Sequence, residues 1–224
     1  IGAPNSLTVL AGQSPLDSLP RGGWSPDFLP PSTDTTVNAM IVADSQLVVA
    51  GEFNGLGVCG QAHGIASWDG SKWYGYGDGL PGGVKAVVVW NNQLVAGGTF
   101  TVASEAGANY LATWNGTSWQ PFPVEVDGPV RALSVYHGRL IVGGTFVSAG
   151  AVTLNCIGAW DGSQWSSLGG GITGNPSPPE VDALYVMFNK LFAGGFISTA
   201  GTTPVQDIAA WNDTTWSALD SGCS

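Results

Sequence analysis

The chain has 224 residues, of which only 10% are charged, and its sixteen acidic and six basic residues give a net charge of −10. Such a chain lacks the basic surface that binds nucleic acid or an anionic membrane, so we expect neither as a partner. No apolar run reaches the roughly eighteen residues that a membrane-spanning helix needs, so we also expect no membrane insertion.

Residues 1–36 contain strand-like stretches that return later in the chain. "LTVLAGQ" at 7–13 and "PLDSLPRGGW" at 15–24 are spaced as the second strand and second hairpin of a repeating unit would be. The segment has no counterpart of the strand that opens each later unit. We therefore interpret residues 1–36 as a degenerate unit or as an N-terminal arm.

Four repeats follow, each opened by a valine-rich strand. The opening stretches are "VNAMIV" at 37, "VKAVVV" at 84, "VRALSV" at 130 and "VDALYV" at 181. Each is followed by a short polar turn and a second strand that ends in glycine. Self-similarity at a fixed period predicts a repeat architecture, with units at 37–83, 84–129, 130–180 and 181–224.

Each repeat also contains two tryptophans separated by a turn-forming tetrapeptide. The stretches are "SWDGSKW" at 67–73, "TWNGTSW" at 113–119, "AWDGSQW" at 159–165 and "AWNDTTW" at 210–216. Asn-Gly and Asp-Gly favour the tight turn of a β-hairpin. A symmetric turn places Trp160 directly opposite Trp165, so that the pair covers one face of the outer hairpin, where the next unit can pack.

Two hairpins per repeat predict an all-β protein made of four-stranded antiparallel sheets. Sheets of this kind, repeating every 46 residues or so, are typical of the blades of a β-propeller. We expect a single domain spanning 1–224 with five blades, the N-terminal one incomplete; four blades plus an N-terminal arm is the alternative. The "VGGTF…IGAWDGSQW" pattern resembles divergent Kelch-type repeats of secreted bacterial and fungal cell-surface proteins over residues 37–219, although its two tryptophans lie closer than the Tyr and Trp of the usual Kelch unit.

One position of the opening strand varies while its neighbours repeat. It is occupied by polar residues that would line the channel of a propeller and could bind a ligand there: Asn38, Lys85, Arg131 and Asp182. Alternatively these residues satisfy one another, with Asp182 offsetting Lys85 or Arg131. Tyr74, Tyr76 and Tyr110, at or near the long loops where we expect ligands, could stack on sugar rings or simply pack between blades.

The remaining candidate residues favour no catalytic chemistry. His63 in a long loop and His137 in a tight turn should lie at opposite faces, so we expect no metal centre, no cofactor and no enzymatic activity. We expect a disulfide between Cys59 and Cys223, with Cys156 unpaired. Asn115 and Asn212 begin acceptor triplets for N-glycosylation in exposed turns.

The sequence thus favours a non-catalytic extracellular or cell-surface protein that assembles into a surface layer, matrix or filament. Its partner would be itself or another extracellular protein, through strand addition at the N-terminus. A glycan-binding, lectin-like propeller is the second hypothesis and a hydrolase the third.

Overall fold

The computed structural model describes residues 36–55, 62–101, 108–174 and 178–219, and the regular elements in these ranges are all strands. The all-β prediction is therefore confirmed. Sixteen of the strands form four-stranded antiparallel sheets, one for each repeat.

The strands of each sheet pair in chain order, from the innermost to the outermost. The first sheet contains β1 (Val37–Ala43), β2 (Gln46–Gly51), β3 (Ile65–Trp68) and β4 (Trp73–Gly75). The second contains β5 (Val84–Trp90), β6 (Gln93–Gly98), β7 (Leu111–Trp114) and β8 (Trp119–Pro121). The third contains β9 (Val130–Tyr136), β10 (Arg139–Gly144), β13 (Ile157–Trp160) and β14 (Trp165–Ser167). The fourth contains β16 (Glu180–Met187), β17 (Lys190–Phe196), β20 (Ile208–Trp211) and β21 (Trp216–Ala218).

Two smaller sheets form in the connections of the third and fourth repeats. A hairpin of β11 (Ser148–Ala149) and β12 (Val152–Thr153) lies between β10 and β13, and a three-stranded sheet contains β15 (Ile172–Thr173), β18 (Thr199–Ala200) and β19 (Thr203–Pro204). The second of these joins the connection that leaves the third sheet to the β17–β20 connection of the fourth.

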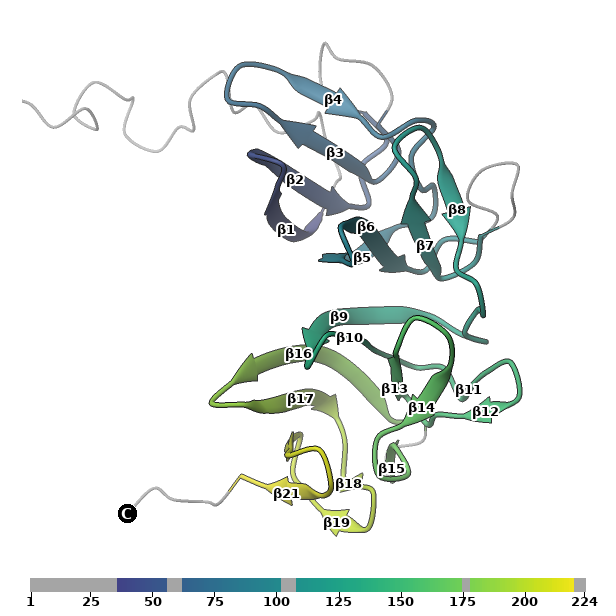
Figure 1. Cartoon of the computed structure of the whole chain (residues 1–224), viewed down its shortest axis with the longest axis vertical. Helices are drawn as coiled ribbons and strands as arrows, with labels where there is room; N and C mark the ends of the chain where they lie inside the picture. Colours follow the sequence, from purple (N-terminus) through teal and green to yellow (C-terminus); the bar gives the residue numbers. More distant parts are fainter. Residues whose placement is uncertain (1–35, 56–61, 102–107, 175–177, 220–224) are drawn as a thin grey trace, which may run out of the picture.

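The four sheets follow one another in an arc, which Figure 1 shows in a view down the shortest axis of the molecule. The innermost strands β1, β5, β9 and β16 gather on the inner side of the arc, and each contacts the next. The outermost strands β4, β8, β14 and β21 lie on the periphery. The described residues do not close this arc into a ring, because β1 and β16 lie at its two ends.

Each innermost strand carries a β-bulge directly after the valine of its opening stretch, which is the first residue of β1, β5 and β9 and the second residue of β16. Val37 pairs with Gly51 and Ala39 with Ala50, so Asn38 has no partner of its own in the ladder. The same shift occurs at the corresponding positions of β5, β9 and β16. A bulge re-aims the side chain of its extra residue, and it also places the first and fourth residues of the opening stretch, such as Val37 and Met40, on the same face of the sheet.

The tryptophan pairs lie where the sequence predicts them. Trp160 is directly opposite Trp165 and their ring centroids are 5.4 Å apart; the other three pairs have the same register and nearly the same separation. The neighbouring unit that they face is not the expected one. The indole Nε1 of Trp165 donates to the Val124 carbonyl at 2.8 Å, and that of Trp216 donates to the Leu168 carbonyl at 2.7 Å. The pairs of the last three sheets therefore pack against the preceding sheet rather than the next.

Three of the four hydrophobic clusters in the described residues lie between successive sheets. One cluster joins the first and second sheets, another the second and third, and the largest the third and fourth. Because a four-stranded sheet has two apolar faces, each inner sheet contributes one face to each of two clusters. Among the described residues, the two end sheets each have one face with no neighbouring sheet. On that face of the first sheet lies the fourth and smallest cluster, formed by Val49, Phe53, Ala62 and Ala66.

Candidate binding surfaces

The four predicted channel residues lie at the bulges of the innermost strands, where three of them form ion pairs across neighbouring sheets. Lys85 pairs with the carboxylate of Glu52 in the preceding sheet. Arg131 pairs with Glu180 and, at 3.5 Å, with Asp182, both in the following sheet. Asn38 donates through Nδ2 to the Val84 carbonyl at 2.8 Å. These contacts hold adjacent innermost strands together and occupy the charges that a ligand would otherwise meet.

The acidic partners Glu52 and Glu180 were not among the residues singled out from the sequence. A signal existed: Glu52 occupies the position that is threonine in the next two repeats, at Thr99 and Thr145. Charge at a position that is neutral in the sister repeats indicates a contact that only one pair of sheets makes. Burial is the largest influence on the Glu180 carboxyl and raises its pKa, against the opposing effect of Arg131.

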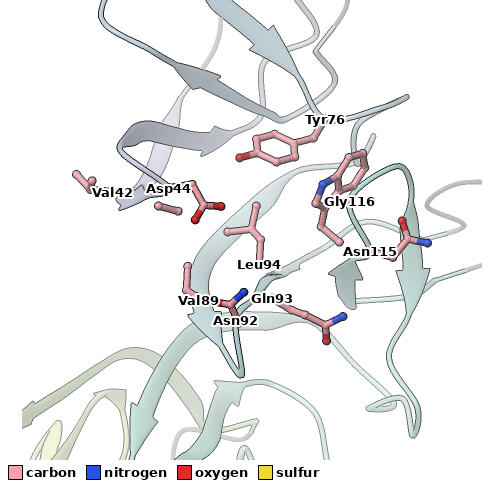
Figure 2. A pocket seen from close by; sticks show the side chains of 11 residues that line it. Val42, Asp44, Tyr76, Val89, Asn92, Gln93, Leu94, Asn115 and Gly116 are labelled. Carbon is pink, nitrogen blue, oxygen red and sulfur yellow. The ribbon is translucent and has the colours of Figure 1, made fainter.

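A groove of about 500 Å³ lies between the first and second sheets (Figure 2). Tyr76 and Trp114 meet edge to face in its wall, with ring centroids 5.2 Å apart. The polar lining comes from tight turns: Asp44 from β1–β2, Asn92 and Gln93 from β5–β6, and Asn115 from β7–β8. The groove thus opens at the tight-turn end of the sheets, whereas we expected ligand sites among the long loops.

The three candidate tyrosines do not form one site. Tyr76 lies in the groove, while Tyr74 is at the outer edge, where its hydroxyl donates to Asp69 at 2.9 Å and Lys72 lies over its ring. Tyr110 packs against the cluster between the second and third sheets. Of the three, only Tyr76 is placed beside amide side chains that could bind a sugar.

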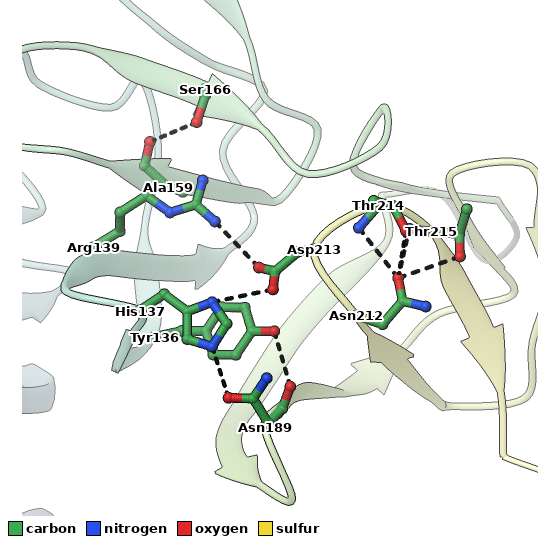
Figure 3. Close-up of polar contacts among 10 residues, drawn as sticks. All are labelled: Tyr136, His137, Arg139, Ala159, Ser166, Asn189, Asn212, Asp213, Thr214 and Thr215. Carbon is green, nitrogen blue, oxygen red and sulfur yellow. Dashed lines mark hydrogen bonds and ion pairs between the residues drawn. The ribbon is translucent and has the colours of Figure 1, made fainter.

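A polar cluster joins the turns of the third and fourth sheets (Figure 3). An Asp213 carboxylate oxygen lies 3.1 Å from His137 Nδ1 and another pairs with Arg139 at 3.6 Å, and His137 Nε2 lies 2.9 Å from Asn189 Oδ1. The Tyr136 hydroxyl donates to the Asn189 carbonyl at 3.1 Å. Sequence reasoning missed Asp213, although it replaces the glycine of the other three Trp-x4-Trp turns and keeps a positive φ of 78°.

The two histidines lie at opposite ends of the strands, as the topology requires. His137 is in the β9–β10 turn, whereas His63 precedes β3 in the connection from β2. Within the described ranges, no three His, Cys, Asp or Glu side chains are grouped as metal ligands would be. The same part of the chain contains no helix that could cross a membrane.

The expected cysteine pairing lies outside the described residues, since both Cys59 and Cys223 fall there. Cys156 is a free, buried thiol whose Sγ lies 3.3 Å from the Pro179 carbonyl. Burial, reinforced by the nearby charges of Glu180 and Asp127, raises the pKa of this thiol to about 11.

The two glycosylation triplets occupy exposed turns with identical hydrogen bonding. Asn115 Oδ1 accepts from the Thr117 amide at 2.9 Å, and Asn212 Oδ1 accepts from the Thr214 amide at 3.1 Å. Asn115 also lines the groove. A glycan attached there would stand at the groove mouth.

The two ends of the arc present apolar side chains to solvent, and two of them, Val37 and Ile208, have counterparts that are fully buried in the other sheets. We call the exposed face of the first sheet the leading flank, formed by Val37, Met40, Val42 and Trp73. We call the exposed face of the fourth sheet the trailing flank, formed by Tyr185, Met187, Gly194 and Ile208. The side chain of Tyr185 is 66% exposed and that of Val42 is 76% exposed.

Comparisons with known proteins assign no family to the chain. No protein-family model matches it, and no curated protein is similar to it. Among solved structures it is similar to two computationally designed proteins, Ika8 and Ika4, and to the extracellular domain of a putative one-component system, BT4673, from B. thetaiotaomicron.

These structural likenesses are weak. The identities are 18%, 16% and 12%, with TM-scores of 0.46, 0.44 and 0.49, respectively. The matches cover 81%, 73% and 81% of this chain. They cover 47% of the Ika8 chain, 88% of the Ika4 chain and 21% of the BT4673 chain. None of the three is similar enough to assign a function to this chain.

Proposed function

We propose that this chain is a non-catalytic, extracellular scaffold whose function is to associate with other protein molecules in a surface layer, matrix or filament. The observation that carries the proposal is the pair of exposed apolar flanks at the two ends of the sheet array. Repeat proteins that act alone need terminal repeats with a polar outer face. Contiguous exposed apolar surface marks a site of protein association.

We further infer that the four sheets are blades of a Kelch-type β-propeller. The supporting features are the strand order from inner to outer, the arc of the sheets and the apolar clusters between them. The fifth, incomplete blade expected from residues 1–36 and the strand addition expected from Ile1–Gly12 lie outside the described residues.

The polar residues at the inner strands favour a structural role over a ligand-binding one. Lys85 and Arg131 each pair with a carboxylate of a neighbouring sheet. A charged ligand in this position would have to displace those partners. The ion pairs are therefore better suited to fixing the angle between sheets.

The association function is tested by the mass of the purified full chain in solution. Sedimentation over a wide range of concentration should show species heavier than the 22.9 kDa monomer. A control protein with Tyr185→Lys and Met40→Lys should associate less, because each substitution places a charge on an apolar flank. A strictly monomeric native chain that also binds no other extracellular protein would contradict the proposal.

A second candidate function, glycan binding, rests on the groove between the first and second sheets. An aromatic face beside several amide groups is the combination that sugar rings bind, because the ring faces are apolar while the hydroxyls need donors and acceptors. A glycan array with the native chain and with Asn92→Ala tests this function. Binding that Asn92→Ala removes would support it, and an empty array would reject it.

A further inference from the structure

The two flanks are the two halves of one interface that recurs inside the molecule. Between the second and third sheets, the first valine of β9, Val130, packs against Gly97; between the third and fourth, Val181 packs against Gly143. A β-carbon added to Gly97 would lie 2.3 Å from Val130 Cγ1, and one added to Gly143 would lie 2.6 Å from Val181 Cγ1. The glycine is therefore a seat that the valine of the next sheet fills. Between the first and second sheets the seat position is Ala50, and Val84 is fully buried in the same cluster.

The leading flank contains the opening valine Val37, which is exposed rather than packed on the seat position of another sheet. Val84, Val130 and Val181, the first residues of the repeated opening stretch, are each 0% exposed, whereas Val37 at the same position is 45% exposed. Met40 follows on the same face, because the bulge at Asn38 shifts the alternation. Its counterpart Val87 is buried against the first sheet.

The trailing flank contains the seat glycine Gly194, and within the described residues no valine side chain packs against it. A β-carbon added to Gly194 would meet only the Asp207 carbonyl oxygen, at 3.7 Å. Ile208 at the start of β20 is 40% exposed, although its counterparts Ile65, Leu111 and Ile157 are 0% exposed. Leu219, the counterpart of Leu168, is also exposed, while the carbonyl of Leu168 accepts the indole N–H of Trp216.

We propose that the trailing flank of one copy of this chain packs against the leading flank of a second copy, with Val37 of the second copy seated on Gly194 of the first. The contact continues the internal sheet-to-sheet interface across the boundary between chains. It also brings the Trp73 indole of one copy to the Leu219 carbonyl of the other. This proposal rests on the association function above and names its partner and its geometry.

The main alternative to a second copy, as the partner of the two flanks, is the N-terminal segment of the same chain. Residues 1–36 contain no Val-x-Ala-x-x-Val stretch, the one that supplies the seated valine in the other repeats. Its single valine, Val9, lies in "LTVLAGQ", which corresponds to the second strand of a repeat rather than to the opening strand that supplies the seated valine. A second copy provides that valine on a strand already flanked by its own sheet.

The contact is head to tail, because it joins two different surfaces of the same chain. Such a contact closes into a ring where its rotation allows and otherwise continues as an open assembly. Either outcome buries both flanks of every inner copy. An open assembly presents a leading flank at one end and a trailing flank at the other.

Cross-linking tests the geometry directly. In the two internal interfaces, an added β-carbon on the seat glycine lies 3.0 and 3.2 Å from the valine Cβ, close to the separation of about 3.8 Å in a disulfide. We would mix two full-length variants, Val37→Cys and Gly194→Cys, each also carrying Cys59→Ser and Cys223→Ser. Mild oxidation should give a covalent dimer from the mixture and little from either variant alone.

A matched pair of glycine variants provides the second test. Because Ala50 occupies the seat position beside the buried Val84, the test needs a side chain larger than a methyl group. Gly194→Leu should leave the unfolding midpoint of the single chain unchanged and weaken association by about tenfold or more, because the new side chain fills the seat. Gly97→Leu, the control, should lower the unfolding midpoint, because its side chain collides with Val130 within the chain. Gly194→Leu chains that associate as tightly as the native chain would overturn the proposal.

The failures of the two proposals are distinguishable. Association without a covalent link in the mixture would show that the chains meet elsewhere, which overturns the flank contact and leaves the association function standing. A native chain that remains monomeric at every concentration and binds no extracellular protein would overturn both. A monomer with flanks covered by residues 1–35 belongs to this second outcome.

Discussion

The tryptophan pairs show how one residue type serves two contacts at once. Each ring lies against its cross-strand partner, and in the last three sheets the second indole also donates to a carbonyl of the preceding sheet. Trp160 and Trp165 are nearly fully buried, whereas Trp68 and Trp73 of the first sheet are only partly so. The same motif is therefore a core element in one repeat and part of an open flank in another.

Trp160→Ala should destabilise the chain by about 3–5 kcal/mol, because it opens a cavity beside Phe122 and Trp165 in a packed cluster. Trp68→Ala is the matched control, and we expect it to cost clearly less in the monomer because the leading flank is open. Urea unfolding followed by circular dichroism measures both. Equal costs would show that the first pair is as enclosed as the third.

Cys156 should be chemically inert in the folded chain. With a pKa near 11, only roughly one thiol in a thousand is ionised at pH 8, and burial excludes reagents as well. In a chain with Cys59→Ser and Cys223→Ser, iodoacetamide should modify Cys156 slowly in buffer and rapidly in urea. Rapid modification of the native chain would mean that this part of the interface between the third and fourth sheets opens easily.

At the scale of the element, the Trp-x4-Trp hairpins share one turn chemistry whether their first turn residue is Asp or Asn. Asp161 Oδ1 accepts from the Ser163 amide at 2.7 Å and from the Gln164 amide at 2.9 Å. Asn115 Oδ1 makes the same contacts with Thr117 and Ser118. The turn thus requires a side-chain oxygen at this position but no charge.

The Asp161 turn should make the hairpin sensitive to acid. The amides of Gln164 and Ser163 lower the pKa of this carboxyl to about 2. A lowered pKa stabilises the fold above the unfolded value of about 4, and this stabilisation is lost as the pH falls from about 4 towards about 2. Asp161→Asn should keep the stability of the native chain at pH 7 and lose less of it in that acid range.

The measurement is the unfolding midpoint of the two proteins between pH 2 and pH 7. Asp161→Ala is the control, because it removes the acceptor oxygen and should lower the midpoint at every pH. Parallel pH profiles for the native chain and Asp161→Asn would show that the charge of Asp161 does not contribute to the turn.

At the scale of the whole molecule, apolar flanks and net charge act in opposite directions. Each copy carries a net charge of −10, so copies repel one another at low ionic strength. The flanks attract through apolar burial, which salt does not weaken. The balance between the two sets the concentration at which copies associate.

Added salt should therefore strengthen association. Raising the ionic strength shortens the screening length from about 10 Å at 0.1 M to about 3 Å at 1 M, so that the repulsion between copies falls while apolar burial persists. Sedimentation at several sodium chloride concentrations measures the effect, with Tyr185→Lys as the flank control. Association that salt weakens would indicate that charged contacts, rather than the flanks, join the copies.

The sequence by itself determined the all-β class, the four repeats and the cross-strand tryptophan pairs, because each follows from local periodicity and turn chemistry. Val-x-Ala alternation, Asp-Gly and Asn-Gly turns and the Trp-x4-Trp spacing act within a few residues of one another. It also identified the second residue of each opening strand as special, although not as the extra residue of a bulge.

Only the tertiary structure decided which surfaces each repeat turns to which neighbour. Identical motifs have different surroundings at the ends of an array, so Val37 and Ile208 are exposed where their counterparts are buried. The pairing of Arg131 with Glu180 and the meeting of Asp213 with His137 depend on the angle between sheets. Local sequence cannot encode that angle, because it is set by side chains that lie about fifty residues or more apart in the chain and meet only when the sheets pack.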